Sequence, residues 1–247
     1  MSSNTRYWVL LRGLARGQGH WGSFVEELKK KFPQDQFELI DIPGNGTRVS
    51  EDSPLAMKDY VRQVRSKSKF IKEGRKIRLL AISLGGMIAT EWMREYPLEI
   101  EKSYLMCTSA GNFSPMADRF LLPNYFEAAK LFRYHKDGKK WELCILGMVA
   151  NSEERKSAEI PGMISFTNQY PVRRQNVLRQ LLAASRFKFP TEAPGDVVLL
   201  GSHGDRLVSP RCTLEIGKRW GIHPIMHPWA GHDIPVDDPQ WVIEHLL

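Results

Sequence analysis

Short apolar runs alternate with segments in which apolar residues recur at helical spacing, both at the start of the chain and near its end. Helical spacing predicts helices at 20–32, 55–71 and 213–220, one following residue 83, and a last one from Pro239. The apolar runs predict strands at 7–11, 37–42, 79–82, 104–107, 197–200 and 222–226. Strands that alternate with helices favour a parallel sheet with helices on both faces, which is an α/β fold.

Residues 112–190 interrupt this alternation, because their apolar positions follow helical spacing throughout. One stripe contains Trp141, Ile145 and Met148, and another contains Val177 and Leu181. We therefore expect a core made of 1–111 and 191–247, with 112–190 as a helical insertion that covers the carboxyl edge of the sheet.

Composition places the chain among ordinary globular proteins, with 42% apolar and 26% charged residues in 247. That length suits one large domain. The longest apolar run, 143–150, is far shorter than the roughly 20 residues that a membrane span needs. Residues 1–6 do not show a secretory pattern. The three cysteines are scattered and suggest neither a disulfide framework nor a zinc site, so we expect a cytoplasmic protein.

The formal net charge of +7 arises mostly in the insertion, where 13 Lys and Arg stand against 7 Asp and Glu. Because no zinc-finger spacing, RNA-binding motif or basic ladder interleaved with aromatic residues accompanies these charges, we expect no nucleic-acid partner. Solvated helix faces explain such charges most simply. The alternative is a substrate with an anionic group, bound by arginines such as Arg173, Arg174, Arg179 and Arg186.

The segment 76–90 carries the most informative motif. Leu79–Ile82 reads as a buried strand, and Ser83, Leu84 and two glycines lead directly into a helix. Strand, serine, small residues and helix in this order are typical of a nucleophile elbow. The motif is usually Gly-x-Ser-x-Gly, and Ala81 here replaces the first glycine with another small residue. The alternative interpretation is that Ser83 only caps the helix.

Two further polar residues follow predicted strands and complete a candidate triad. Asp205 follows the strand 197–200, and His232 follows the strand 222–226. Ligands of open α/β sheets bind at the carboxyl ends of strands, so Ser83, Asp205 and His232 should meet there. A serine hydroxyl needs an imidazole to accept its proton, and the imidazole needs a carboxylate to orient it.

Other acids and imidazoles compete for these roles. Asp196 precedes its strand and should lie at the opposite edge of the sheet. His223 begins a predicted strand, His203 lies beside the acid, and His227 is a further competitor. We therefore favour Asp205 and His232.

At these motifs the sequence resembles the α/β-hydrolase family. Gly204-Asp205 with Val208 and Pro210, and Gly231-His232 before a last helix, match patterns of that family. The resemblance covers the chain outside the insertion. It implies an α/β-hydrolase fold, with a mostly parallel twisted sheet, helices on both faces, and 112–190 as a helical lid.

The resemblance also implies an oxyanion hole formed by the backbone N–H groups of Leu84 and Leu14. The family usually has His-Gly before the second donor, and this chain has Arg12-Gly13 instead. Candidate substrate-binding residues are His20, Trp21, Met87 and Trp229.

These residues predict a serine hydrolase that cleaves a small carboxylic ester or thioester through an acyl-enzyme, with no metal or organic cofactor. The same fold and triad also carry carbon–carbon bond chemistry, as in meta-cleavage-product hydrolases and the menaquinone-pathway synthase. Met87 stands where that synthase has an arginine. A third alternative is a binding protein on an inactive hydrolase scaffold. The sequence leaves the natural substrate and the oligomeric state open.

Overall fold

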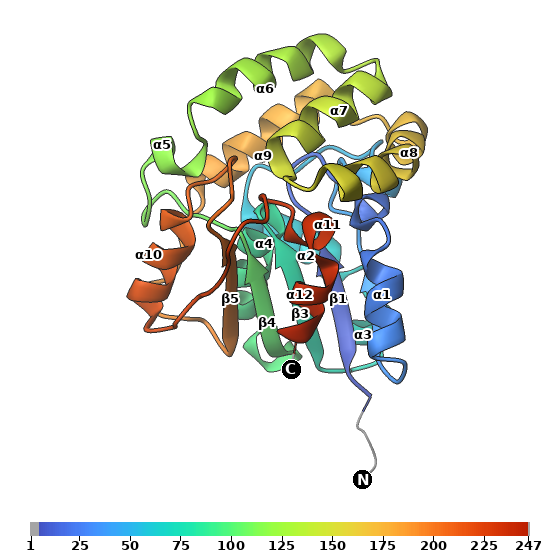
Figure 1. Cartoon of the computed structure of the whole chain (residues 1–247). Coiled ribbons are helices and arrows are strands. Elements are labelled where there is room, and N and C mark those ends of the chain that lie inside the picture. The colour runs from blue at the N-terminus through green and yellow to red at the C-terminus, as the bar shows by residue number, and fades with distance from the viewer. Residues whose placement is uncertain (1–4, 247) are drawn as a thin grey trace.

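Six parallel strands form the centre of the computed structural model, which describes residues 5–246. Their order across the sheet is β2-β1-β3-β4-β5-β6, so all six end at one edge (Figure 1). The strands are β1 (Tyr7–Leu11), β2 (Gln36–Leu39), β3 (Ile77–Ile82), β4 (Ile100–Met106), β5 (Val197–Ser202) and β6 (Ile225–His227). The predicted parallel sheet is confirmed, while residues 1–4 and 247 of the predicted core lie outside the described residues.

Helices cover both faces of this sheet. One face packs against α1 (Phe24–Lys31) and α12 (Pro239–Glu244), and the other against α2 (Met57–Arg65), α4 (Leu84–Glu95) and α10 (Arg211–Trp220). Each face of the sheet forms its own apolar cluster with the helices that cover it, the first with α1 and α12 and the second with α2, α4 and α10. Successive residues of a strand point to opposite faces, so neighbours in β1 belong to different clusters. Trp8 lies in the first cluster and Val9 in the second, and neither is exposed to solvent. Burial on both faces explains why the strands read as continuous apolar runs.

Between β4 and β5 the chain forms a helical segment that lies across the carboxyl ends of the strands (Figure 1). The longest of its helices has 17 residues. Within residues 5–246 no helix has both the length and the apolar character that crossing a membrane requires. The helices are α5 (Met116–Arg119), α6 (Pro123–Tyr134), α7 (Gly138–Val149), α8 (Glu153–Gln169) and α9 (Arg174–Arg186).

The single helix expected over 55–71 is wrong, because the structure has two helices there. After α2 the chain turns at Ser66, and Ser68 caps the start of α3 (Lys69–Lys72). The Ser68 hydroxyl accepts a hydrogen bond from Ile71 N (3.3 Å) and donates one to Glu38 (2.6 Å). A serine that forms such local bonds ends one helix and starts another.

Other boundaries also differ from the sequence prediction: the strand predicted at 37–42 ends at Leu39, and the strand predicted at 104–107 begins at Ile100. The first helix begins only at Phe24, after a separate 3-10 turn at Gln18–Trp21. The last strand begins at Ile225, after Pro224, which has no N–H to donate to a strand partner. A short helix that was not predicted, α11 (Ile234–Asp237), precedes α12.

Three of the four arginines considered for anion binding hold α9 in place. Arg173 donates to the carbonyls of Ser50 (3.2 Å) and Glu51 (2.7 Å) and to the Asp52 carboxylate (2.7 Å). Arg179 donates to Ser53 O (2.5 Å), while Arg174 donates to the carbonyl of Phe132 in α6. These contacts join α9 to the loop 50–53 and to α6. Each of the three guanidinium groups therefore has a hydrogen-bond partner within the protein.

Candidate active site

Ser83 lies in a sharp turn between β3 and α4. Its backbone has φ 57° and ψ −118°, a region that residues other than glycine rarely adopt. Glycine is required at position 85, because a Cβ there would lie 2.5 Å from Leu11 O and 2.8 Å from Arg12 O. The close approach of α4 to the end of β1 therefore explains the glycine two residues after the serine. The strained backbone at Ser83 is the geometry expected of the predicted nucleophile elbow.

The two backbone groups expected to bind an oxyanion lie on either side of this turn. Leu84 is the first residue of α4, so its N–H has no partner within the helix. Gly13 lies against the serine, since a Cβ at Gly13 would be 3.0 Å from Ser83 Cβ and 3.5 Å from Ser83 Oγ. Leu14 follows directly, and the loop is held at Ala15, whose N–H donates to Gln180 Oε1 of α9 (2.9 Å).

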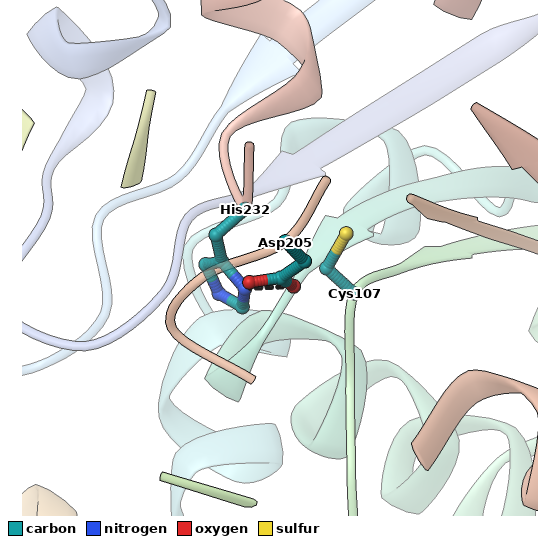
Figure 2. A group of neighbouring side chains, drawn as sticks. All are labelled: Cys107, Asp205 and His232. Carbon is teal, nitrogen blue, oxygen red and sulfur yellow. Dashed lines mark hydrogen bonds and ion pairs between the residues drawn. The ribbon is translucent and has the colours of Figure 1, made fainter. Parts of the chain in front are cut away.

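Asp205 and His232 form a buried pair at the same edge of the sheet (Figure 2). His232 Nδ1 lies 2.7 Å from Asp205 Oδ2, while Asp205 Oδ1 accepts from Leu207 N and Val208 N, both at 2.9 Å. A carboxylate can only accept, so we assign the imidazole proton to Nδ1. This tautomer leaves Nε2 as the acceptor that a serine hydroxyl requires.

His232 Nε2 is buried and has no hydrogen-bond partner among residues 5–246, so no hydrogen bond to Ser83 is formed. Ser83 itself is partly exposed. Ser83 and Asp205 follow β3 and β5, which lie on either side of β4 in the sheet. Catalytic hydrogen bonds in ligand-free enzymes are often long and shorten when substrate binds.

The competing acid and histidines lie elsewhere or are already bonded. Asp196 has a 61% exposed side chain 3.7 Å from Lys102, before the start of β5. His203 and His223 are exposed. His227 is buried, but its Nδ1 accepts from two backbone N–H groups and its Nε2 lies 3.2 Å from Asp238.

Cys107 is a neighbour of the pair that sequence reasoning did not identify. It follows β4 and has φ 46°. Its Sγ lies within 4.8 Å of a carboxylate oxygen of Asp205 and of a ring nitrogen of His232 (Figure 2). Burial, followed by the charge of Asp205, raises the pKa of the Cys107 thiol well above its ordinary value. A metal ion would need the thiolate and would compete with the Asp205–His232 bond. The donor set therefore favours a hydrogen-bonded pair with a neutral thiol beside it over a metal site.

Arg12, which departs from the family pattern, forms a buried ion pair with Asp233. Arg12 Nη1 donates to Asp233 Oδ1 (2.9 Å), Nη2 donates to Oδ2, and the guanidinium lies over the ring of Trp21. Burial alone would raise the pKa of Asp233, but the positive charge of Arg12 holds it below its ordinary value. The pair joins the loop that leads to Leu14 to the residue after His232. It therefore connects the predicted oxyanion loop to the loop that carries the imidazole.

The four predicted substrate-binding residues lie in different surroundings. His20 is buried, with Nδ1 accepting from Gly17 N (2.8 Å) and Nε2 3.1 Å from Thr167 Oγ1 of α8. Trp21 is buried against Phe24. Met87 is also buried, in α4, whereas Trp229 is 47% exposed.

His20 belongs to a buried polar cluster between the core and the helical segment. Glu142 of α7 accepts two hydrogen bonds from Arg16 (2.6 and 2.8 Å) and one from Thr167 (2.7 Å). Burial and the nearby charge of Arg16 lower the pKa of His20 to about 4. Burial alone would raise the pKa of Glu142, but Arg16 and His20 lower it to about 2.

Acidification is expected to destabilise the fold through this cluster. Between the ordinary pKa of 6.5 and the folded value of about 4, the unfolded chain binds a proton at His20 that the folded chain does not. This site therefore removes up to about 1.4 kcal/mol of unfolding free energy per pH unit as the pH falls. Glu142 extends this loss of unfolding free energy to pH values below its ordinary pKa of 4.5, because its folded pKa is lower.

Urea unfolding at a series of pH values would measure this slope. His20→Asn keeps an acceptor for Gly17 N. It should flatten the dependence of the unfolding free energy on pH between the ordinary pKa of His20, 6.5, and its folded value of about 4. An unchanged slope in the variant would contradict the assignment.

Two surface hollows lie away from the candidate active-site residues. One of about 360 Å³ includes Phe113, Asp118 and Arg211, and another of about 470 Å³ includes Asp41 and Lys67. Neither is lined by Ser83, Asp205 or His232.

Comparisons with known proteins agree with this architecture. Residues 8–245 match the model of the alpha/beta hydrolase family. Similar solved structures include a Pseudomonas aeruginosa hydrolase (15% identity, TM-score 0.74, covering 100% of this chain and 90% of that one) and a thermophilic esterase from Thermogutta terrifontis (15%, 0.73, 99% and 89%). Another is 2-hydroxy-6-oxo-6-phenylhexa-2,4-dienoate hydrolase from a Rhodococcus species (19%, 0.72, 98% and 88%). No curated protein matches the sequence significantly.

Proposed function

The chain belongs to the alpha/beta hydrolase family, and from its site we propose that it is a serine hydrolase acting on a carboxylic ester or thioester. The observation that carries the proposal is the 2.7 Å Asp205–His232 pair, with Nε2 left unbonded, at the sheet edge where Ser83 occupies a strained elbow. This arrangement has the parts that activate a serine hydroxyl: an acceptor, an orienting acid and a nucleophile held on a sharp turn.

In the proposed reaction Ser83 Oγ attacks the acyl carbon, and His232 Nε2 takes the hydroxyl proton. The charged imidazole is stabilised by Asp205, and the tetrahedral oxyanion is bound by the N–H groups of Leu84 and Leu14. His232 then donates its proton to the departing alcohol or thiol, which leaves the acyl group on Ser83. Water, deprotonated by His232, then attacks the acyl carbon. The bond from the acyl group to Ser83 Oγ breaks, His232 returns the proton to Oγ, and the carboxylic acid leaves.

We further propose that the helical segment acts as a lid that selects the substrate. The helices α7–α9 are attached to the core by buried polar groups, such as the Arg16–Glu142 ion pair and the bond from Ala15 N to Gln180. In contrast, α6 buries only Asn124 among its residues and leaves Phe126 78% exposed. We therefore assign opening of the site to α6.

Carbon–carbon bond hydrolysis is the second candidate, because the fold is like that of the Rhodococcus dienoate hydrolase. At 19% identity that likeness concerns the fold. The same serine, acid and imidazole can serve either reaction, so substrate chemistry has to distinguish them.

A panel of nitrophenyl esters and acyl thioesters of graded length, together with a vinylogous diketone, tests the proposal. We expect turnover of esters or thioesters with a preference for one acyl length, and a fluorophosphonate adduct on Ser83. Turnover of the diketone alone would replace the proposal with carbon–carbon hydrolysis. Absence of both turnover and labelling would indicate a binding protein.

A further inference from the structure

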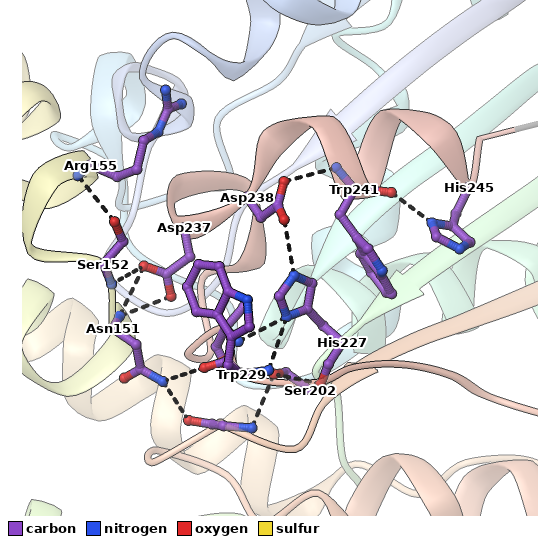
Figure 3. A network of polar contacts seen from close by, with 12 residues as sticks. Asn151, Ser152, Arg155, Ser202, His227, Trp229, Asp237, Asp238, Trp241 and His245 are labelled. Atoms are coloured by element: carbon purple, nitrogen blue, oxygen red, sulfur yellow. Dashed lines mark hydrogen bonds and ion pairs between the residues drawn. The ribbon is translucent and has the colours of Figure 1, made fainter.

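The junction between α7 and α8 is bonded to both loops that carry the Asp205–His232 pair. The side chain of Asn151 donates to Gly204 O (2.9 Å), next to Asp205, and to Trp229 O (2.8 Å), three residues before His232 (Figure 3). In addition, Asp233 N donates to Val149 O (2.8 Å). One short stretch of the helical segment therefore contacts both the loop after β5 that carries Asp205 (the acid loop) and the loop after β6 that carries His232 (the histidine loop).

Asp237, the last residue of α11, joins the junction to the histidine loop a second time. Its carboxylate accepts from Asn151 N (2.9 Å) and Ser152 N (2.8 Å) (Figure 3). It also accepts from Gly231 N (2.6 Å). Asp237 is 4% exposed and forms no ion pair with any residue that the structure describes. Three backbone donors thus share one buried carboxylate, and hydrogen bonds to a charged acceptor are the strong ones.

Close packing leaves little freedom at these contacts. A Cβ on Gly231 would lie 2.4 Å from Val149 O, and a Cβ on Gly204 would lie 2.1 Å from Trp229 O. Arg206 adds a bond from its guanidinium to Ala150 O (3.0 Å). Backbone movement at the junction would therefore be transmitted to the residues beside His232 and Asp205.

We propose that Asp237 and Asn151 are positioning residues, which fix the imidazole of His232 relative to Asp205 and Ser83 through the α7–α8 junction. The helical segment is then part of the catalytic frame at this junction and keeps its place there when the site opens. The kinetic part of this proposal rests on the proposed hydrolase function, whereas the geometric part does not.

Two substitutions test the proposal. Asp237→Asn turns one acceptor oxygen into an NH₂ group facing backbone N–H donors, and Asn151→Ala removes both bridging bonds. We expect kcat to fall by about 10- to 100-fold with little change in KM, because misplacement of a reacting group by about 1 Å has effects of that size. The rate of fluorophosphonate labelling should fall in parallel.

Asp35→Asn is the matched control. Asp35 has a 5% exposed side chain and accepts from Arg6 and Trp8, before β2 and far from the site. Its loss should lower the Tm while leaving kcat unchanged. If Asp237→Asn and Asn151→Ala also lower only the Tm, the residues are structural and the proposal is wrong. Should Asp237→Asn not fold, Asn151→Ala decides by the same criteria.

A measurement without substrate separates this proposal from the hydrolase proposal. The proton on His232 Nδ1, bonded to Asp205, should give a downfield proton NMR signal in the wild type. We expect the signal to shift or broaden in both variants and to persist in Asp35→Asn. An unchanged signal in the variants would overturn the positioning role, whether or not the chain hydrolyses esters.

Discussion

Replacing Ser83 or His232 with alanine is expected to lower kcat for ester or thioester hydrolysis by up to about a millionfold. Ser83→Ala removes the attacking oxygen, and His232→Ala removes the base that takes its proton. Both residues act in one step, so Ser83→Ala combined with His232→Ala should be little worse than either change alone. Residual activity would come from the oxyanion hole and substrate binding.

Steady-state kinetics on the best substrate of the panel would measure these effects. His223→Ala is a matched control, because His223 is an exposed histidine that precedes β6, whereas Ser83 and Asp205 follow the strands of the same parallel sheet. It should retain wild-type kcat and KM. Near-native turnover by Ser83→Ala would show that another group is the nucleophile.

Removing Arg12 is expected to have the largest effect on stability. Arg12→Ala leaves the Asp233 carboxylate buried without its counter-charge, and both side chains of this pair are less than 5% exposed. Breaking such a buried pair costs about 3–5 kcal/mol of unfolding free energy. Since the unpaired carboxylate would lie beside His232, it should also favour the charged imidazole. The acid limb of the kcat/KM pH profile should therefore move to higher pH.

Urea unfolding and the pH profile would measure the two effects separately. Arg62→Ala is a matched control, because Arg62 pairs with Asp59 at 3.2 Å on the surface, with a 59% exposed side chain. An exposed pair of this kind contributes less than about 1 kcal/mol. If Arg12→Ala costs no more than Arg62→Ala, the buried pair does not hold the two loops together.

The parallel sheet could be predicted from the sequence because its signals are local. A strand buried on both faces is a continuous apolar run, as in Leu79–Ile82, and a tight strand-to-helix turn needs small residues such as Ala81 and Gly85. Helix boundaries were less predictable. The break between α2 and α3 depends on the bond from Ser68 to Glu38, which is 30 residues away in the chain.

The candidate triad was predicted in the same way, from residues that directly follow strands. Parallel strands end at one edge, so their order places Ser83, Asp205 and His232 at that edge without further information. The contact between Asp205 and His232 agrees with this prediction. The catalytic roles of these three residues stay predictions. The roles of Leu14 and Leu84 as oxyanion donors, and of Trp229 at the substrate, stay predictions as well.

The sequence by itself determined the alternation of elements and the residues at the strand ends, because each depends on neighbours within a few positions. Only the tertiary structure decided how Arg12, which lies 221 residues from Asp233, is neutralised, and why His20 is held in a buried cluster. It also decided that Asn151 and Asp237 join the helical segment to the histidine loop. Such pairings depend on which side chains long-range folding brings together, and residue spacing along the chain carries no signal for them.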